Sequence, residues 1–186
     1  VTVKGNSVIN GDVEVSGTIG EGQSRQLYVE GGKFTGKFTV SDKPANIAIS
    51  GGTFTSEVPA EYCAAGYIPT KNEDGSYGVK EGSYVAETND VKYESLAEAI
   101  TAAESGATVT LLADCASDRI NLEKSITVDL NGKVLTSTAE YGVMFCAKNG
   151  KTITINGTTE GSKLVGTLMV TNGTYGHIVI NGGTYE

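Results

Sequence analysis

Three copies of one apolar-Asn-Gly string recur in the last third of the chain: Leu130-Asn131-Gly132, Ile155-Asn156-Gly157 and Ile180-Asn181-Gly182. Consecutive copies are 25 residues apart, and a second apolar row keeps the same step at Ile120, Phe145 and Val170. Apolar and polar residues alternate before the Asn-Gly pairs, which predicts short strands with one buried face, each followed by a turn. Because one such turn of chain cannot bury its apolar face alone, a fixed long period predicts a parallel β-solenoid.

The first third of the chain repeats on a different period. Residues 27–35 recur as residues 47–55, an offset of 20, and both copies contain a Gly-Gly pair and a Phe. Residues 13–17 show the same alternation upstream at a shorter spacing. A β-sandwich is the alternative fold, but it would show hairpin signals about every 8–12 residues and no fixed long period.

One amphipathic helix interrupts the strand pattern. Its apolar stripe has helical spacing and consists of Leu96, Ala99, Ile100 and Ala103. Ser95 stands three residues before Glu98, which predicts a capping box at the helix start, and Gly106 is the predicted stop. A strand should follow at residues 108–112. Such a helix can cover the open end of a solenoid, where interior side chains and unpaired strand edges would otherwise face water.

The helix divides the chain into two modules. We expect residues 1–80 to form the end of a first β-helix module, with residues 58–80 as its cap. This cap should contain a short helical turn within residues 59–66 and a hairpin around Asp74-Gly75. Residues 81–92 are the predicted linker. The second module should occupy residues 93–186 and begin with the capping helix.

Composition narrows the classes of function. The chain has 186 residues and a net charge of -8, and an acidic surface repels phosphate groups, which argues against binding of nucleic acid or anionic membranes. No apolar run approaches the roughly 18 residues of a membrane span. The three cysteines, Cys63, Cys115 and Cys146, have no metal-binding spacing. We interpret them as buried thiols, with a Cys115–Cys146 disulfide as the alternative.

The stretch around the predicted helix is similar to a known family. Residues 93–111 resemble the opening of right-handed parallel β-helix domains of the pectin-lyase-like superfamily. Residues 49–54 and 62–77 resemble a repeated unit of large surface proteins in Gram-positive, often gut-dwelling, bacteria. The resemblance implies a right-handed β-helix and an extracellular or cell-surface location. The superfamily contains lyases, hydrolases, adhesins and inert stalks, so the resemblance alone does not define an activity.

Few residues suggest catalysis. Polysaccharide lyases of the resembling families use a basic residue beside calcium-binding carboxylates, and the nearest match is Asp114, Asp118 and Arg119, which we interpret as a solvated loop. His177 has no visible acid or nucleophile partner. Residues Asn72-Glu73-Asp74-Gly75 lack the alternating oxygen ligands of a calcium loop and indicate a hairpin turn. We therefore predict no catalytic residue, no metal site and no cofactor.

The repeated asparagine and aromatic positions predict which side chains pack inside the solenoid and which face outward. Asn131, Asn156 and Asn181 should form a ladder in equivalent corners. Phe34, Phe54, Tyr175 and Tyr185 should fill the interior. Tyr28 alternates with Leu27 and Val29, so its ring should point outward, where it could stack on a sugar.

The expected function is a non-enzymatic structural or adhesive segment of a bacterial surface or secreted protein. It would display a repetitive face to glycans or host proteins, and many weak contacts would add up through avidity. The alternatives are a polysaccharide lyase or glycoside hydrolase module, and an inert stalk or spacer. The sequence starts without a Met and stops in the middle of the repeating motif, so we expect it to be a piece of a larger exported protein. The last strand, at residues 178–180, should pair with the first turn, residues 1–15, of a neighbouring copy.

Overall fold

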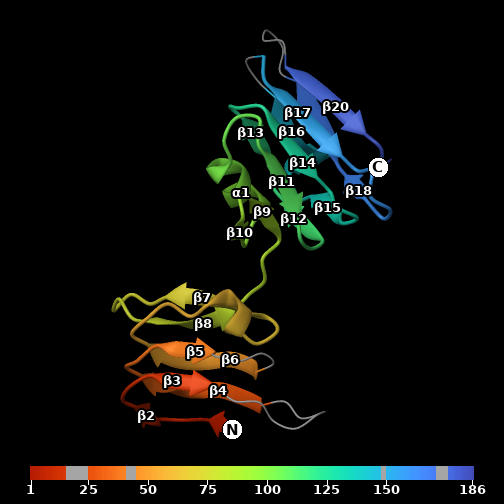
Figure 1. Cartoon of the computed structure of the whole chain (residues 1–186). Coiled ribbons are helices and arrows are strands. Elements are labelled where there is room, and N and C mark those ends of the chain that lie inside the picture. The colour runs from red at the N-terminus through yellow and green to blue at the C-terminus, as the bar shows by residue number, and fades with distance from the viewer. Residues whose placement is uncertain (16–24, 41–44, 148–149, 171–175) are drawn as a thin grey trace. The chain divides into compact units, whose positions relative to one another are not determined.

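The computed structural model describes residues 1–15, 25–40, 45–147, 150–170 and 176–186 (Figure 1). The chain is mostly β and contains parallel sheets, as the sequence predicts. It divides into two compact units, Val1–Ser83 and Tyr84–Glu186. Each unit has its own cluster of buried apolar side chains, so each is described by itself.

Parallel pairing organises the first unit. Its strands β1 (Thr2–Val3) and β2 (Val8–Ile9) both pair with β4 (Arg25–Phe34), which pairs with β6 (Ala45–Phe54). A separate pair consists of β3 (Val13–Val15) and β5 (Phe38–Val40).

The register tests the repeat of the first unit. Leu27 lies beside Ile47, and Phe34 beside Phe54, which confirms the 20-residue offset. The predicted shorter spacing of residues 13–17 is wrong, because Val13 lies beside Phe38. The residues beside Tyr28 and Val29 are instead Thr2 and Val3. One circuit, meaning the stretch of chain from a residue to its partner on the next parallel strand, is therefore longer between β1 and β4 than between β4 and β6.

An antiparallel hairpin follows the last parallel strand of the first unit. It consists of β7 (Tyr67–Lys71) and β8 (Tyr77–Glu81), and β8 continues the sheet beyond β6. The predicted turn at Asp74-Gly75 is confirmed: Gly75 has a φ of 83°, and the Asp74 carboxylate accepts hydrogen bonds from Ser76 N and Oγ at 3.0 and 2.6 Å. A 3₁₀ turn at Ala60–Tyr62 matches the predicted helical turn.

Two stacked phenylalanines lie at the centre of the first core. The rings of Phe34 and Phe54 are 4.9 Å apart and tilted by 8°, and both side chains are buried. Because side chains alternate along a strand, Val29 and Ile49 point to the same interior, while Tyr28 points outward and is 40% exposed. The predicted placements of Phe34, Phe54 and Tyr28 are confirmed.

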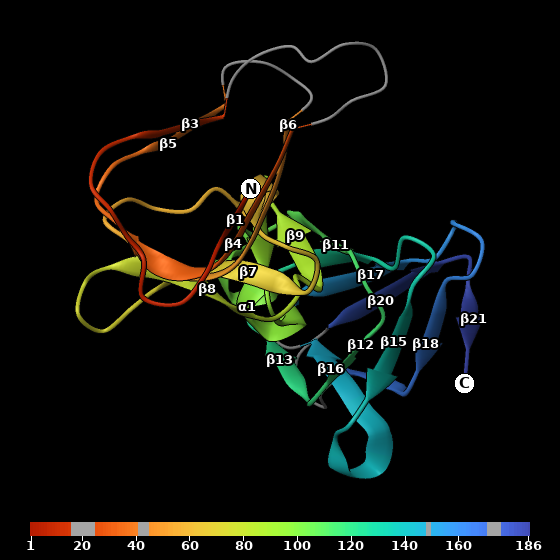
Figure 2. The same cartoon turned by 90° about the horizontal axis from the view of Figure 1, so that it is seen from below.

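The second unit contains three sets of parallel strands, which the chain visits in turn. The first set is β11 (Thr108–Leu111), β14 (Ile126–Asp129), β17 (Thr152–Asn156) and β20 (His177–Asn181). The second is β12 (Cys115–Ser117), β15 (Val134–Ser137), β18 (Lys163–Val165) and β21 (Thr184–Tyr185), which lie side by side in Figure 2. The third is β13 (Ile120–Leu122), β16 (Val143–Ala147) and β19 (Thr167–Val170). The first three circuits of chain each add one strand to each set, and the last described circuit adds β20 and β21 to the first two sets.

The register of these sets corrects both predicted rows. Asn156 lies beside Asn181 but on its other side lies Asp129, not Asn131. In the second row, Ile120 does lie beside Phe145, whereas the neighbour of Phe145 on the next strand is Leu168. The paired residues Asp129 and Asn156 are 27 residues apart but Asn156 and Asn181 only 25, so the number of residues per circuit is not constant and identical sequence spacing does not give identical register.

Two short strands lie in the predicted linker. Within residues 81–92 the chain forms β9 (Ala86–Thr88) and begins β10 (Val91–Tyr93), which pair antiparallel, and β9 also pairs with β11. Asn89 and Asp90 connect them with φ values of 51° and 62°, as in a two-residue hairpin turn. The linker prediction is corrected here, since Ala86 and Thr88 are both buried.

The predicted helix is present as α1 (Leu96–Ala102). The Ser95 hydroxyl accepts a hydrogen bond from Glu98 N at 3.2 Å, which confirms the predicted N-cap, and the apolar stripe is buried. The helix ends before the predicted stop, because Ala103 is already extended and Gly106, with a φ of 88°, turns the chain into β11. Lys124 Nζ donates to the carbonyls of Thr101 and Ala103, which are unpaired at the helix end.

Candidate functional site

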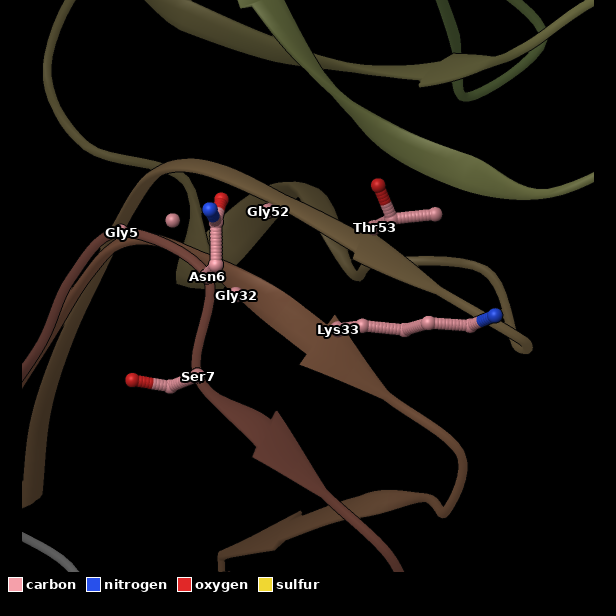
Figure 3. Close-up of a pocket in the computed structure, with 8 residues that line it drawn as sticks. Gly5, Asn6, Ser7, Gly32, Lys33, Gly52 and Thr53 are labelled. Carbon is pink, nitrogen blue, oxygen red and sulfur yellow. The ribbon is translucent and has the colours of Figure 1, made fainter.

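A polar hollow in the first unit is the best-defined candidate site. It has a volume of about 400 Å³ and is open to solvent. It crosses three successive circuits of chain, and its lining residues are Gly5, Asn6, Ser7, Gly31, Gly32, Lys33, Gly52 and Thr53. Figure 3 shows the side chains of Asn6 and Thr53 pointing to the same side of the strands, whereas those of Ser7 and Lys33 extend in opposite directions away from the glycines.

Close approach of neighbouring strands explains the glycines of the floor. A Cβ atom on Gly31 would lie 3.0 Å from both N and O of Gly5. Gly32 and Gly52 have φ values of 105° and 106°, a conformation that other residues rarely adopt. No side chain therefore covers the backbone at the floor of the hollow, and the polar side chains lie at its margins.

The margins of the hollow supply hydrogen-bonding groups and one cation. Ser7 and Thr53 contribute hydroxyls, Asn6 an amide and Lys33 an ammonium group, and no lining residue among those described carries a carboxylate. Next to the floor, Lys4 Nζ forms an exposed ion pair with Glu30 at 2.9 Å. Such a set suits a ligand rich in hydroxyl groups, which both donate and accept.

An anion near the hollow reduces its positive character. Hydrogen bonds from the side chain and then the backbone of Ser76 hold the pKa of Asp74 below its ordinary value, with a smaller contribution from the charge of Lys33. The negative charge of Asp74 therefore lies within electrostatic range of Lys33, at one margin of the hollow.

A smaller hollow lies beside the hairpin. It has a volume of about 290 Å³ and is lined by Glu57, Pro69, Thr70, Lys71 and Tyr77. The ammonium group of Lys71 lies 5.8 Å from the centroid of the Tyr77 ring, a cation–π contact within the protein. The face of that ring is thus already occupied by a side chain of the same hairpin.

The outward Tyr28 is a single aromatic on a polar sheet face. Its hydroxyl donates a hydrogen bond to Gln26 Oε1 at 2.8 Å. Its neighbours in register are Thr2 and Ala48, so the aromatic surface does not extend to the adjacent strands. Tyr28 could stack on one sugar ring.

The residues that suggested catalysis have local structural partners. Asp114 Oδ1 accepts from Val134 N at 2.9 Å, and Asp118 Oδ1 accepts from Arg119 N at 2.7 Å. Both carboxylates thus accept hydrogen bonds from backbone groups, that of Val134 at the start of β15 and that of the neighbouring Arg119. His177 is exposed at the start of β20, where its backbone N donates to Lys151 O. Across the described ranges, no group of three or more His, Cys, Asp and Glu side chains converges on a metal position.

The cysteines are free thiols. Cys115 and Cys146 belong to different strand sets, on β12 and β16, so the alternative of a disulfide between them is wrong. Cys146 is fully buried and the other two are half-buried. Burial first, and then the charge of Glu61 or Asp114, raises the pKa of the Cys63 and Cys115 thiols respectively, which makes both less reactive at neutral pH.

The predicted asparagine ladder and the predicted interior position of the C-terminal tyrosines are only partly present in the structure. Asn131 Nδ2 donates to Leu111 O at 3.0 Å instead of joining a ladder, and Asn156 Oδ1 accepts from the Thr158 hydroxyl at 3.3 Å. Tyr185 packs against the core of the second unit, as predicted, and burial raises its pKa. Tyr175 lies outside the described residues.

Sequence reasoning missed the hollow itself. The signal for it was the Gly-Gly pair shared by residues 27–35 and 47–55, which we used only to define the period. A pair of glycines at the same place in successive circuits removes two side chains from each, and the removed volume becomes a depression.

Comparison of the chain with protein-family models, with curated proteins and with solved structures finds no match. No helix of the described residues has the length and hydrophobicity needed to cross a membrane.

Proposed function

We propose that the chain forms a right-handed parallel β-helix in each unit and serves as a non-enzymatic structural or adhesive segment. The three strand sets of the second unit support this fold, since the chain visits them in the same order in successive circuits. The parallel register between circuits is what a β-helix requires. Right-handedness follows from the strong general preference of crossover connections between parallel strands.

The proposed activity is the binding of a hydroxyl-rich glycan in the polar hollow of the first unit. The single observation that carries it is a depression of about 400 Å³ that crosses three circuits and is lined by amide, hydroxyl and ammonium groups. A glycan chain lying across the circuits would meet Asn6 or Ser7, then Lys33, then Thr53. Weak contacts of this kind become effective when many copies act together.

The proposed setting is a bacterial surface or a secreted protein. The similarity of residues 49–54 and 62–77 to a repeated unit of Gram-positive surface proteins supports it. The second candidate is a polysaccharide lyase or glycoside hydrolase module, which the region of Asp114, Asp118 and Arg119 would favour. The backbone hydrogen bonds of both carboxylates favour a structural role for these residues instead.

A binding experiment separates these functions. Neutral and acidic glycans are screened on an array, and the best binder is titrated calorimetrically against wild type, Lys33→Ala and Lys92→Ala. Loss of one hydrogen bond is worth about 1 kcal/mol, so Lys33→Ala should weaken binding by about fivefold. Lys92→Ala removes the same charge from the exposed strand β10 and should leave binding unchanged.

The same screen contains the opposing outcomes. Absence of binding to every glycan would favour a spacer. Release of unsaturated or reducing ends from any polysaccharide would favour the enzyme, and equal weakening by the two lysine variants would place the glycan outside the hollow.

A further inference from the structure

Tyr141 in the second unit has a backbone conformation that tyrosine disfavours. Its φ and ψ are 61° and 15°, which is the left-handed helical region. The other described non-glycine residues with positive φ are Asn89, Asp90 and Asn131, residue types that adopt this conformation more readily than most. A bulky L-residue is strained there, because its Cβ atom crowds the following carbonyl oxygen.

The sequence of this turn departs from the pair that its geometry prefers. Gly142 also has a positive φ, of 67°, so two consecutive residues are left-handed, as in a type I′ turn. Asn-Gly is a preferred pair for that turn. The chain itself has such a pair at Asn131-Gly132, with φ values of 47° and 74°. Backbone geometry therefore does not explain why residue 141 is a tyrosine.

Packing inside the protein does not explain this tyrosine either. Its side chain is 87% exposed, more than any other aromatic side chain whose exposure the structure describes. Tyr141 is not among the residues that form or contact the core of the second unit. In Figure 2 the connection between β15 and β16, which carries Tyr141, projects beyond the strands. A strained backbone that presents an unpacked side chain to solvent is typical of a residue that contacts a ligand.

Neighbouring circuits hold this turn in place. Thr138 N donates to Ser117 O on the preceding circuit at 2.9 Å, and Gly142 N donates to Ala139 O within the turn at 2.9 Å. On the following circuit, a Cβ atom on Gly166 would lie 3.1 Å from Gly142 O, so the two backbones are in close contact. A ligand that stacks on the ring therefore does not have to order the loop first.

The side chains near Tyr141 indicate the class of ligand. On the three chain segments that meet at this turn, the exposed side chains with polar groups are Asp118, Arg119, Thr138, Glu140 and Thr167. A protein interface has an apolar core and buries roughly 800 Å² on each partner, whereas this surface offers one ring with a polar margin. A sugar ring matches that surface, because its C–H groups stack on an aromatic face and its hydroxyls bond to polar side chains. Two carboxylates against one guanidinium disfavour an anionic sugar.

We propose that Tyr141 is the stacking platform of a carbohydrate site in the second unit, which takes a neutral sugar ring of a glycan. Its residues all belong to Tyr84–Glu186, whereas the polar hollow belongs to Val1–Ser83. The site therefore goes beyond the glycan binding proposed for the hollow and does not depend on it.

An NMR titration of the full chain tests this site. Cellohexaose, xylohexaose and mannohexaose are added in turn, and two-dimensional amide spectra are recorded. Binding at the proposed site should shift the signals of Tyr141 and Gly142, whereas binding in the hollow should shift those of Gly32 and Gly52. If none of the three glycans moves the signals of Tyr141 and Gly142, the proposal is overturned, whatever the signals of the hollow do. Hexagalacturonate, which is anionic, should bind at Tyr141 more weakly than the best neutral glycan, and tighter binding contradicts the proposed class.

Substitutions of Tyr141 separate the ring from the backbone. Tyr141→Asn should weaken binding of the best hexasaccharide at this site by about three- to tenfold, since the aromatic face is lost. The same variant should raise the thermal midpoint of the second unit by about 4 °C, because asparagine relieves the strain, so its lost affinity does not come from unfolding. Tyr141→Phe keeps the ring and should match wild type in both measurements. Binding by Tyr141→Asn that equals wild type, or a midpoint that does not rise, contradicts the proposal.

Discussion

At the scale of single residues, the close approach of circuits is set by glycine. Gly51 lies within β6 and is not among the glycines with positive φ, so its role does not come from backbone freedom. A Cβ atom there would lie 2.6 Å from the carbonyl oxygen of Glu30 on the preceding circuit. The neighbour is backbone and cannot rotate away, so glycine is required by the packing of one strand on another.

Gly51→Ala should therefore destabilise the first unit. Adding a methyl group against fixed backbone typically costs about 1–3 kcal/mol in unfolding free energy. Urea denaturation followed by circular dichroism measures the change, and Ser50→Ala, one residue away, is the control without added volume. Equal urea midpoints for Gly51→Ala and wild type would show that β4 and β6 pack less closely at Gly51 than the structure indicates.

At the scale of elements, one capped helix and two hairpins border the parallel strands. The helix α1 depends on local signals: the Ser95 cap, the apolar stripe and Lys124 at its far end. The hairpin of β9 and β10 depends on Asn89 and Asp90, both with positive φ. Asparagine and aspartate adopt this conformation more readily than most residues, so the Asn-Asp pair was a signal for a turn inside the predicted linker.

Ser95→Ala should destabilise the second unit by about 1 kcal/mol, because Glu98 N loses its hydrogen-bond acceptor at the helix start. The control is Ser105→Ala, which removes an exposed hydroxyl outside the helix. Thermal or urea unfolding of both variants measures the difference. If the two substitutions change stability equally, the Ser95 hydroxyl does not act as a cap.

At the scale of the whole molecule, two separate cores define two units. The buried cluster of the first unit and the side chains packed on it all come from residues 3–79. Those of the second unit all come from residues 85–185. A unit with its own apolar core can fold alone.

Fragments 1–83 and 84–186 should therefore each fold independently. Backbone amide chemical shifts of each fragment should reproduce those of the same residues in the full chain, except near the cut. A two-dimensional NMR spectrum of each fragment provides the measurement. Collapsed, narrow amide dispersion in either fragment would mean that its core needs the other unit.

Sequence alone determined those features whose causes are local or strictly periodic. The alternation of β-branched residues predicted strands, Ser95 and Glu98 predicted the start of the helix, and Asp74-Gly75 predicted the hairpin turn. The offset between residues 27–35 and 47–55 predicted the register of β4 and β6 at both ends of the pair, whereas the local shift that places Glu30 beside Gly51 had no signal in the repeat.

Only the tertiary structure decided the rest. Asp129 and not Asn131 lies beside Asn156, because register depends on the summed length of the connections in each circuit, whereas sequence spacing counts residues without showing where the extra ones lie. The polar hollow likewise arises only when Gly5, Gly31 and Gly52 come together from three circuits. A depression formed by absent side chains has no signal within any one strand, because its depth depends on how closely the neighbouring strands pack.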